Sequence, residues 1–179
     1  MTTDLEPAVW PVTARHCDAG VLQLGGVDVR DLAAQYGTPA YVLDEDDFRG
    51  RARAWREAFE GADVYYAGKA FLCTAVARWV AEEGLSLDVC TGGELAVALA
   101  AGFPVERLLF HGNNKSVPEL ERAVAAGVGR IVIDSFDELV RLAAVVGPLI
   151  ARPGSTASRG TARPTSAHSF STTRRRPSA

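Results

Sequence analysis

The chain is poor in lysine, cysteine and histidine, and each scarcity narrows what the protein can be. Lys69 and Lys115 are the only lysines among 179 residues, and arginine supplies the rest of the positive charge. The three cysteines, Cys17, Cys73 and Cys90, are odd in number and lack the spacing of metal ligands, which argues against a disulfide framework or a zinc motif. We expect reduced core or site thiols with mostly inert packing roles, as in a cytoplasmic protein.

Long apolar runs and nucleotide-binding motifs are also missing. No stretch approaches 18 apolar residues, so no membrane span is predicted. Asp4 and Glu6 stand where a signal peptide would be apolar. No Gly-x-Gly-x-x-Gly follows a predicted strand, which excludes the dinucleotide-binding fingerprint.

Charge divides the chain at about residue 150. Residues 151–179 hold six arginines and no acid, whereas residues 1–150 hold 13 basic and 22 acidic residues and carry a net charge of −9. Binding to phosphate backbones requires a positive footprint. The acidic body therefore argues against nucleic acid as its main partner.

The N-terminal part predicts short elements of mixed type. After an irregular entry over residues 1–20, residues 21–29 alternate around a glycine pair, which is typical of a β-hairpin. A short helix is expected over residues 31–36, ending at Gly37. Residues 40–43, Ala-Tyr-Val-Leu, predict a buried strand.

Asp44 predicts the N-cap of a helix that runs to about residue 60. Apolar residues at helical spacing predict one buried face, and arginines on the other faces predict a solvated surface. The predicted core positions are Phe48, Ala52, Trp55 and Phe59, and the predicted surface arginines are Arg49, Arg51, Arg53 and Arg56.

From residue 63 onward, strands and helices alternate with a repeat of about 20 residues. We expect strands over residues 64–68, 85–90, 107–111 and 130–134, each followed by a helix that ends at a glycine (Gly84, Gly102, Gly127 and Gly147). Three of these helices begin with a Ser/Thr-x-x-Glu capping box. This alternation predicts a parallel α/β sheet, and its compact connections favour a (β/α)8 barrel over a doubly wound sheet.

Barrel chemistry lies at the carboxyl ends of strands, which here carry Lys69, Asp88, residues 111–114 and Asp134. A partly desolvated Lys69 amine is a nucleophile toward carbonyls, and Asp88 could hold it as ammonium. The plainer alternatives are a lysine that extends to solvent, a solvated strand-end acid and an ordinary Gly/Asn turn.

A glycine pair and two histidines are weaker candidates for a site. Gly92 and Gly93 could receive a phosphate at a helix N-terminus, although a capping box with permissive glycines explains them more simply. His16 and His168 lie outside the repeat and are not expected to be ligands.

Three segments resemble a known family in order and spacing. They are residues 66–71 (Tyr-Ala-Gly-Lys-Ala-Phe), 88–94 (Asp-Val-Cys-Thr-Gly-Gly-Glu) and 111–116 (His-Gly-Asn-Asn-Lys-Ser). Over residues 20–150 the chain resembles the diaminopimelate decarboxylases, within the fold-type III pyridoxal-phosphate decarboxylases. The first segment marks the superfamily, and the third indicates the diaminopimelate branch.

The resemblance implies an alanine racemase-like barrel that binds pyridoxal 5′-phosphate and decarboxylates meso-2,6-diaminopimelate to L-lysine. Lys69 would form the Schiff base, Asp88 would lie beside it, and His111 and Asn113 would line the cofactor pocket. Residues 1–44 would contribute to a second β-domain, and residues 45–150 would form the first half of the barrel. The family is homodimeric, and the oligomeric state of this chain stays open.

After Ile150 the sequence departs from the family. The last 29 residues hold 11 Ser/Thr, six Arg and three Pro, a composition that cannot bury enough apolar surface to order itself. We expect a disordered basic tail that arose by a frameshift, with a genuine anion-binding tail as the alternative.

Three functions remain in competition. The first is diaminopimelate decarboxylase by descent, with little or no activity from this chain alone, because four β/α units are half a barrel. The second is another fold-type III decarboxylase or a racemase. The third is a non-catalytic fragment that acts by binding, through its tail or through its open sheet edge.

Overall fold

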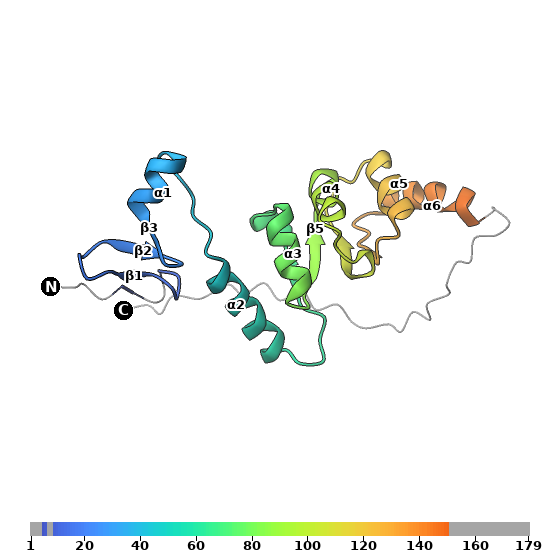
Figure 1. The fold of residues 1–179 in the computed structure, drawn as a ribbon. Helices are drawn as coiled ribbons and strands as arrows, with labels where there is room; N and C mark the ends of the chain where they lie inside the picture. Colours follow the sequence, from blue (N-terminus) through green and yellow to red (C-terminus); the bar gives the residue numbers. More distant parts are fainter. Residues whose placement is uncertain (1–4, 7–8, 151–179) are drawn as a thin grey trace, which may run out of the picture.

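The computed structural model describes residues 5–6 and 9–150, with the side chains of residues 148–150 left out. It contains two sheets that follow one another along the chain (Figure 1). The first is a small antiparallel sheet near the N-terminus, and the second is a four-stranded parallel sheet with helices. The predicted tail over residues 151–179 lies outside the described residues.

The N-terminal sheet confirms the predicted hairpin and adds a strand to it. Its strands are β1 (Arg15–His16), β2 (Leu22–Leu24) and β3 (Val27–Asp28), paired antiparallel in the order β1-β2-β3. Gly25 and Gly26 turn between β2 and β3 with φ of 57° and 81°, a region where glycine is favoured. The sequence prediction missed β1, because a two-residue strand has no periodicity to detect.

Helix α1 (Val29–Tyr36) begins two residues earlier than predicted. The Asp28 carboxylate accepts the backbone N–H of Arg30 at 2.8 Å and caps the helix there. The end at Gly37 is confirmed by its φ of 80°.

The predicted buried strand over residues 40–43 is wrong. The segment belongs to neither sheet of the described chain, and Tyr41, Val42 and Leu43 are exposed, Tyr41 completely. An apolar run indicates that a segment would be stable as a buried strand, but it does not show whether another strand lies beside it. Without a neighbouring strand the backbone cannot form a ladder.

Helix α2 (Glu45–Ala58) confirms its N-cap, because Asp44 accepts the backbone N–H of Asp47 at 2.9 Å. Its apolar stripe is buried only in the first half. Ala52 is buried, and Phe48 packs edge-on against Tyr66 with ring centroids 5.2 Å apart. The prediction is wrong for the second half, where the rings of Trp55 and Phe59 stack on each other and stay more than half exposed.

The predicted solvated surface of α2 is confirmed for Arg51, Arg53 and Arg56, which are exposed, but not for Arg49. The Arg49 side chain is 21% exposed and forms ion pairs with Glu82 at 2.5 Å and Glu83 at 3.0 Å. Arg53 pairs with Glu83 at 2.9 Å, and Arg56 donates to the Glu83 carbonyl at 2.7 Å. The sequence showed the arginines but not the acidic end of the next helix against which they pack.

The parallel sheet confirms the predicted alternation. Its strands pair in chain order, which is the strand order of a (β/α) barrel. They are β4 (Tyr65–Ala67), β5 (Ser86–Val89), β6 (Leu108–Phe110) and β7 (Arg130–Ile131). The intervening helices are α3 (Thr74–Glu82), α4 (Gly92–Ala100), α5 (Val117–Ala126) and α6 (Phe136–Ile150), with short 3-10 turns η1 (Gly68–Ala70) and η2 (Val105–Arg107).

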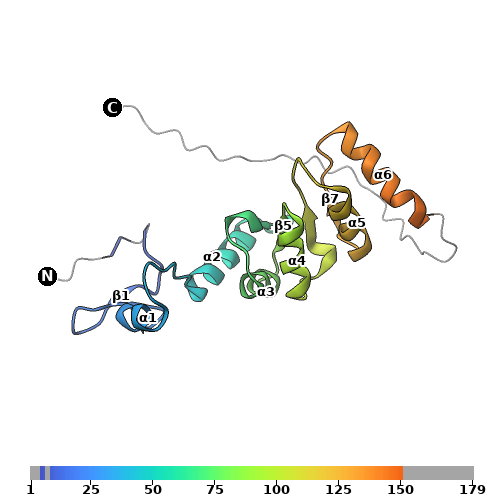
Figure 2. The same cartoon turned by 90° about the horizontal axis from the view of Figure 1, so that it is seen from above.

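Consecutive helices from α2 to α6 pack side by side, in the same order as the strands, and they follow one another along the molecule in Figure 2. Alternate strand residues face this helical layer and form the core. The fully buried members on β5 and β6 are Leu87, Val89, Leu108 and Phe110. The other strand face is concave and carries the carboxyl-end side chains.

Two details of the helix ends differ from prediction. Helix α6 does not end at Gly147 but continues to Ile150, and Gly147 is not among the glycines with positive φ. Of the three predicted capping boxes, only the one at Ser116 is complete. Glu94 and Glu138 instead accept backbone N–H groups one residue further back, at Cys90 and Asp134.

Arg130 spans the concave face from β7 to the opposite edge of the sheet. Its guanidinium donates to the Tyr65 hydroxyl at 2.5 Å and to the Asp63 carboxylate at 3.0 Å. This contact joins the two edge strands of the described sheet, which are three strand spacings apart. In the described part of the chain, none of the helices is long and apolar enough to cross a membrane.

Candidate active site

Lys69 lies in the tight turn η1, two residues beyond the end of β4, and is exposed. The preceding Gly68 is buried, and a Cβ there would lie 3.0 Å from the Asp88 carbonyl oxygen and 3.3 Å from Leu72. Glycine is therefore needed for the close approach of this turn to β5. The lysine is presented at the carboxyl edge of the sheet because the residue before it has no side chain.

Asp88 lies beside Lys69 on the concave face. In the parallel register Asp88 pairs with Ala67 on one side and Leu109 on the other, and Lys69 follows in η1, close enough for its charge to act on Asp88. His111 follows β6, and its Nδ1 lies 3.7 Å from Asp88 Oδ2. The structure thus brings together three of the four predicted site residues.

The environment of Asp88 is unusual for a strand-end acid. Its side chain is 17% exposed, and Oδ1 is buried without a hydrogen-bond partner in the described structure. Burial raises the pKa of Asp88, and the nearby charges of His111 and Lys69 offset part of this effect. The solvated-acid alternative does not fit this burial.

Cys90 is a site residue that the sequence analysis did not single out. It lies two residues beyond Asp88, on the same face. The Cys90 thiol, an Asp88 carboxylate oxygen and a His111 ring nitrogen lie within 4.8 Å of one another. Burial raises the pKa of the Cys90 thiol, and the neighbouring carboxylates add to the effect. The spacing of two residues on a predicted strand was the signal that could have found it.

Lys115 anchors the loop after β6 to the loop after β7 and to α6. The Lys115 side chain is 1% exposed, pairs with Glu138 at 2.7 Å and donates to the carbonyls of Gly112 and Val132. Asn113 is exposed on this loop, and no hydrogen bond joins it to Lys69, Asp88 or His111 in the described structure. Lys115 is therefore structural, and Lys69 is the lysine available for chemistry.

The glycine pair at the start of α4 matches neither explanation fully, because the capping box at Thr91 is incomplete and the Gly92 amide is already bonded. The Gly92 N–H donates to Glu119 Oε1 at 2.7 Å, and a Cβ on Gly92 would lie 2.9 Å from Glu119 Cγ. The amide that a phosphate would need is already bonded to a carboxylate. His16 lies in the N-terminal sheet, where its Nδ1 contacts the Gly20 carbonyl at 3.1 Å, and His168 lies outside the described residues.

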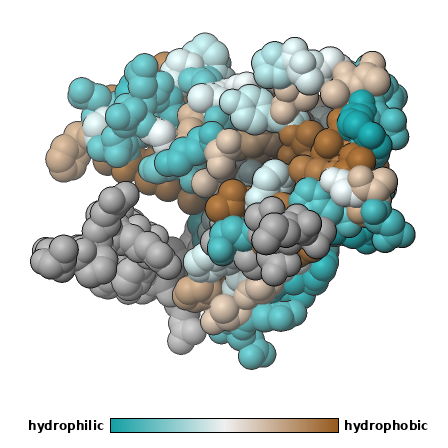
Figure 3. Space-filling view, turned by 90° about the vertical axis from the view of Figure 1, so that its left-hand side faces the viewer, coloured by the Kyte–Doolittle hydropathy of each residue, from teal (hydrophilic) through white to brown (hydrophobic). Residues whose placement is uncertain are grey.

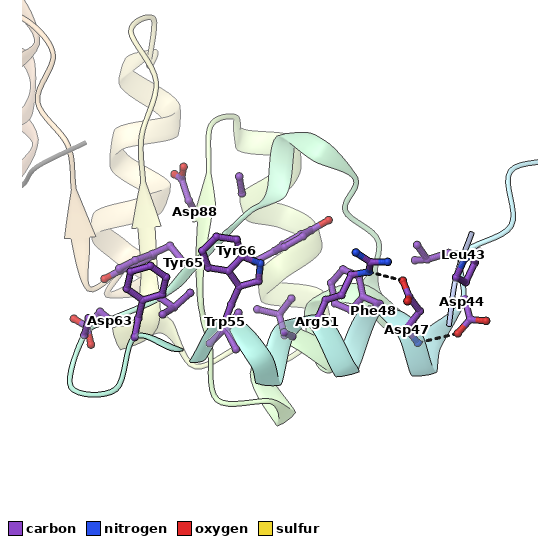
Figure 4. A pocket seen from close by; sticks show the side chains of 18 of the residues that line it. Leu43, Asp44, Asp47, Phe48, Arg51, Trp55, Asp63, Tyr65, Tyr66 and Asp88 are labelled. Carbon is purple, nitrogen blue, oxygen red and sulfur yellow. Dashed lines mark hydrogen bonds and ion pairs between the residues drawn. The ribbon is translucent and has the colours of Figure 1, made fainter. Parts of the chain in front are cut away.

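A groove of about 980 Å³ runs between α2 and the free edge of β4 (Figure 4). Trp55, Tyr65 and Tyr66 line it, and Asp88 lies at its margin. Apolar surface is also visible on the side of the molecule shown in Figure 3. The groove itself reaches the candidate site at Asp88.

Comparison with known proteins gives this geometry its context. The profile of the family "Pyridoxal-dependent decarboxylase, pyridoxal binding domain" matches residues 45–164. The chain belongs to this family. Its match includes β4 to α6 and therefore all four predicted site residues.

Curated relatives refine the family assignment. Diaminopimelate decarboxylase from Mycobacterium tuberculosis is 59% identical over 144 residues, covering 80% of this chain and 32% of that protein. The Bacillus subtilis enzyme of the same name is 50% identical over 134 residues, covering 73% and 30%. The chain thus spans about a third of the length of the curated relatives that it matches.

Solved structures share the fold. A protein from Aquifex aeolicus is 34% identical with a TM-score of 0.72, covering 76% of this chain and 34% of that one. Diaminopimelate decarboxylase from M. jannaschii, in complex with L-lysine, is 28% identical with a TM-score of 0.68, covering 78% and 34%. These likenesses confirm the α/β fold as the first part of a fold-type III decarboxylase barrel.

Proposed function

We propose that this chain forms the Lys69-bearing part of a pyridoxal-phosphate-dependent decarboxylase that converts meso-2,6-diaminopimelate to L-lysine. The observation that carries the proposal is the convergence of Lys69, Asp88 and His111 at the carboxyl ends of three adjacent strands. They converge in a chain whose family is pyridoxal-binding.

The residues present fit the cofactor in their chemistry. Lys69 offers an exposed primary amine, which can bind an aldehyde covalently. The buried, unpaired Oδ1 of Asp88 offers a polar contact that the protein itself leaves unused. His111 and Asn113 are proposed to line the pocket. When bound, pyridoxal phosphate supplies the electron sink for the electrons released with CO2.

The role of the protein's own residues in the reaction is inferred from the charges of Asp88 and Lys69. Asp88 lies close enough to Lys69 for the lysine charge to lower the carboxyl pKa against the larger, opposing effect of burial. Asp88 is therefore proposed to steer the Lys69 amine by its charge.

The substrate assignment rests on the relatives. The diaminopimelate decarboxylases are 50–59% identical to this chain, whereas the lysine/ornithine decarboxylase from Vibrio vulnificus is 28% identical. This difference favours diaminopimelate over other amino acids. Another fold-type III substrate is the second candidate, and a fragment that acts by binding is the third.

The domain boundaries and the location are part of the proposal. Residues 45–150 are proposed as the first half of the cofactor barrel and residues 1–44 as a contribution to a β-domain. The free thiols of Cys17, Cys73 and Cys90 support a cytoplasmic location.

Reductive trapping tests the role of Lys69. The chain is incubated with pyridoxal phosphate, reduced with borohydride and mapped by mass spectrometry. We expect a single cofactor adduct on Lys69, much less on the buried Lys115, and none at that position in Lys69→Ala. Equal labelling of both lysines in the folded chain would contradict the assignment.

Turnover requires a separate measurement. We expect the 179-residue chain by itself to show no stable absorbance of bound cofactor and to release little CO2 from diaminopimelate. Within the described residues β4 and β7 each have one unpaired edge, which leaves the concave face open. Stoichiometric adduct formation with CO2 release would contradict this expectation. Release from ornithine but not from diaminopimelate in a longer chain would favour the second candidate.

A further inference from the structure

We propose that Tyr66 is a positioning residue for Lys69, because its side chain bridges the turn that presents the lysine. This inference rests on the proposed function, in which the Lys69 amine reacts with the cofactor aldehyde. The Tyr66 hydroxyl donates to the Phe71 carbonyl at 2.8 Å. Tyr66 lies on β4 before η1 and Phe71 follows η1, so the bond closes a loop around Lys69.

Other side chains do little to fix this turn. Both η1 and α3 begin without a side-chain cap, whereas the hydroxyls of Thr91 and Ser135 accept a backbone N–H at the starts of α4 and α6. Among the described residues, Tyr66 is the one side chain that hydrogen-bonds to the backbone of residues 68–73. The exposed amine is thus presented by a segment whose side-chain hydrogen bonding depends on a single tyrosine hydroxyl.

Packing fixes where the Tyr66 hydroxyl lies. Its ring packs edge-on against Phe48 of α2 with centroids 5.2 Å apart, and Phe48 contacts Trp79 of α3 with centroids 5.8 Å apart. Tyr66 and Phe48 both line the groove in Figure 4. Burial raises the pKa of Tyr66, so the hydroxyl keeps its proton and acts as a donor. The bond to Phe71 therefore connects the Lys69 turn to the packing of α2.

The charge of Lys69 makes its position measurable. Burial raises the pKa of Asp88, and the charges of His111 and Lys69 oppose this effect. The charge of Glu94 adds to the increase. The pKa of Asp88 therefore depends on how close the Lys69 amine is. A turn closed by Tyr66 keeps the amine near Asp88 and reduces the orientations that it must lose before it attacks an aldehyde.

The Tyr66→Phe variant tests the bond because it removes the hydroxyl and keeps the ring. Its matched control is Tyr65→Phe, which removes the adjacent hydroxyl that accepts from Arg130. Both variants of the full chain are incubated with pyridoxal phosphate, and the adduct on Lys69 is trapped with borohydride over time. We expect Tyr66→Phe to form the adduct at least about threefold more slowly than wild type, as for the loss of one hydrogen bond, and Tyr65→Phe to match wild type. Equal rates for the two variants would overturn the proposal.

A second readout needs no cofactor and separates positioning from stability. The pKa of Asp88 is measured by NMR titration of its carboxyl carbon in the chain without pyridoxal phosphate. We expect this pKa to be higher in Tyr66→Phe than in wild type, by part of the rise seen in Lys69→Ala. In the Lys69→Ala background, Tyr66→Phe should cause no further rise. A hydroxyl that only added stability would leave the Asp88 pKa unchanged, and that result would overturn the proposal.

The two readouts distinguish this inference from the proposed function. A higher Asp88 pKa in Tyr66→Phe, without any adduct on Lys69 in wild type, would refute the function and support the role of Tyr66. An adduct that forms equally fast in wild type and Tyr66→Phe, with an unchanged Asp88 pKa, would retain the function and overturn the role of Tyr66. Urea unfolding should show that Tyr66→Phe remains folded, since Phe48 still packs against its ring.

Discussion

The Lys115 ammonium lies 2.7 Å from the Glu138 carboxylate, and the two side chains are only 1% and 2% exposed. This buried pair joins the loop that carries His111 to the start of α6. Lys115 also donates to the carbonyls of Gly112 and Val132. The position of His111 therefore depends on contacts made one β/α unit later in the chain.

Breaking this pair should be strongly destabilising. We expect Lys115→Met to lower the free energy of unfolding by about 3–5 kcal/mol, because Glu138 would be left buried and unpaired. The Lys115→Met/Glu138→Leu double variant should recover part of the loss. The matched control is Asp63→Asn in the exposed Arg130–Asp63 pair, with an expected cost of about 1 kcal/mol or less. Equal costs for the two single variants in urea unfolding would contradict this.

The same pair predicts a pH dependence. Burial opposes ionisation of Glu138, but hydrogen bonds from Lys115 and the Asp134 N–H outweigh it and lower the pKa below its ordinary 4.5. A lowered pKa contributes stability above the unfolded-state value that is lost as the pH falls through the folded-state value. The stability difference between wild type and Glu138→Gln should therefore shrink below about pH 4.5. A difference that stays constant down to pH 3 would argue against an ionised Glu138.

The contribution of Asp88 to stability should change with pH in the opposite direction to that of Glu138. Because burial raises its pKa, the folded state binds its proton more tightly, and its contribution to stability falls as the pH rises above the ordinary value of 3.8. We expect Asp88→Asn to stabilise the chain without cofactor by about 1 kcal/mol at pH 7, with a smaller gain near pH 4. Urea unfolding at the two pH values measures this, and destabilisation at pH 7 would show that the carboxylate is well paired.

Gly68 should be sensitive to a single added methyl group. A Cβ would lie 3.0 Å from the Asp88 carbonyl and 3.3 Å from Leu72, so we expect Gly68→Ala to cost about 1–3 kcal/mol and to reduce trapping of Lys69. Gly50→Ala is the matched control, because no atom lies within 4 Å of its Cβ position in α2. It should stabilise the chain by about 0.5–1 kcal/mol. Equal effects of the two variants would exclude a packing constraint at Gly68.

The sequence predicted local structure well wherever one unit determines it. The order of strands and helices and the cap at Asp44 follow from short patterns. The convergence of Lys69, Asp88 and His111 follows from the general rule that parallel strands align their carboxyl ends. The three residues could therefore be named before their distances were known.

Predictions failed where the outcome depends on a neighbour distant in sequence. Residues 40–43 have strand composition, but no described strand pairs with them. Trp55 lies on the same helical stripe as Ala52 yet faces the open groove. Cys90 was treated as packing because the sequence does not show that His111 approaches it. Each failure concerns the tertiary neighbour of a residue, and the spacing of apolar residues along the chain does not predict that neighbour.

The Arg130–Tyr65 contact has a consequence for how the sheet assembles. It connects β4 to β7 across the face that carries Asp88, so the two edge strands of the described sheet are tied to each other directly. The link lies entirely within the first four β/α units. Because chains emerge N-terminus first during synthesis, this link could form before any strands added after it.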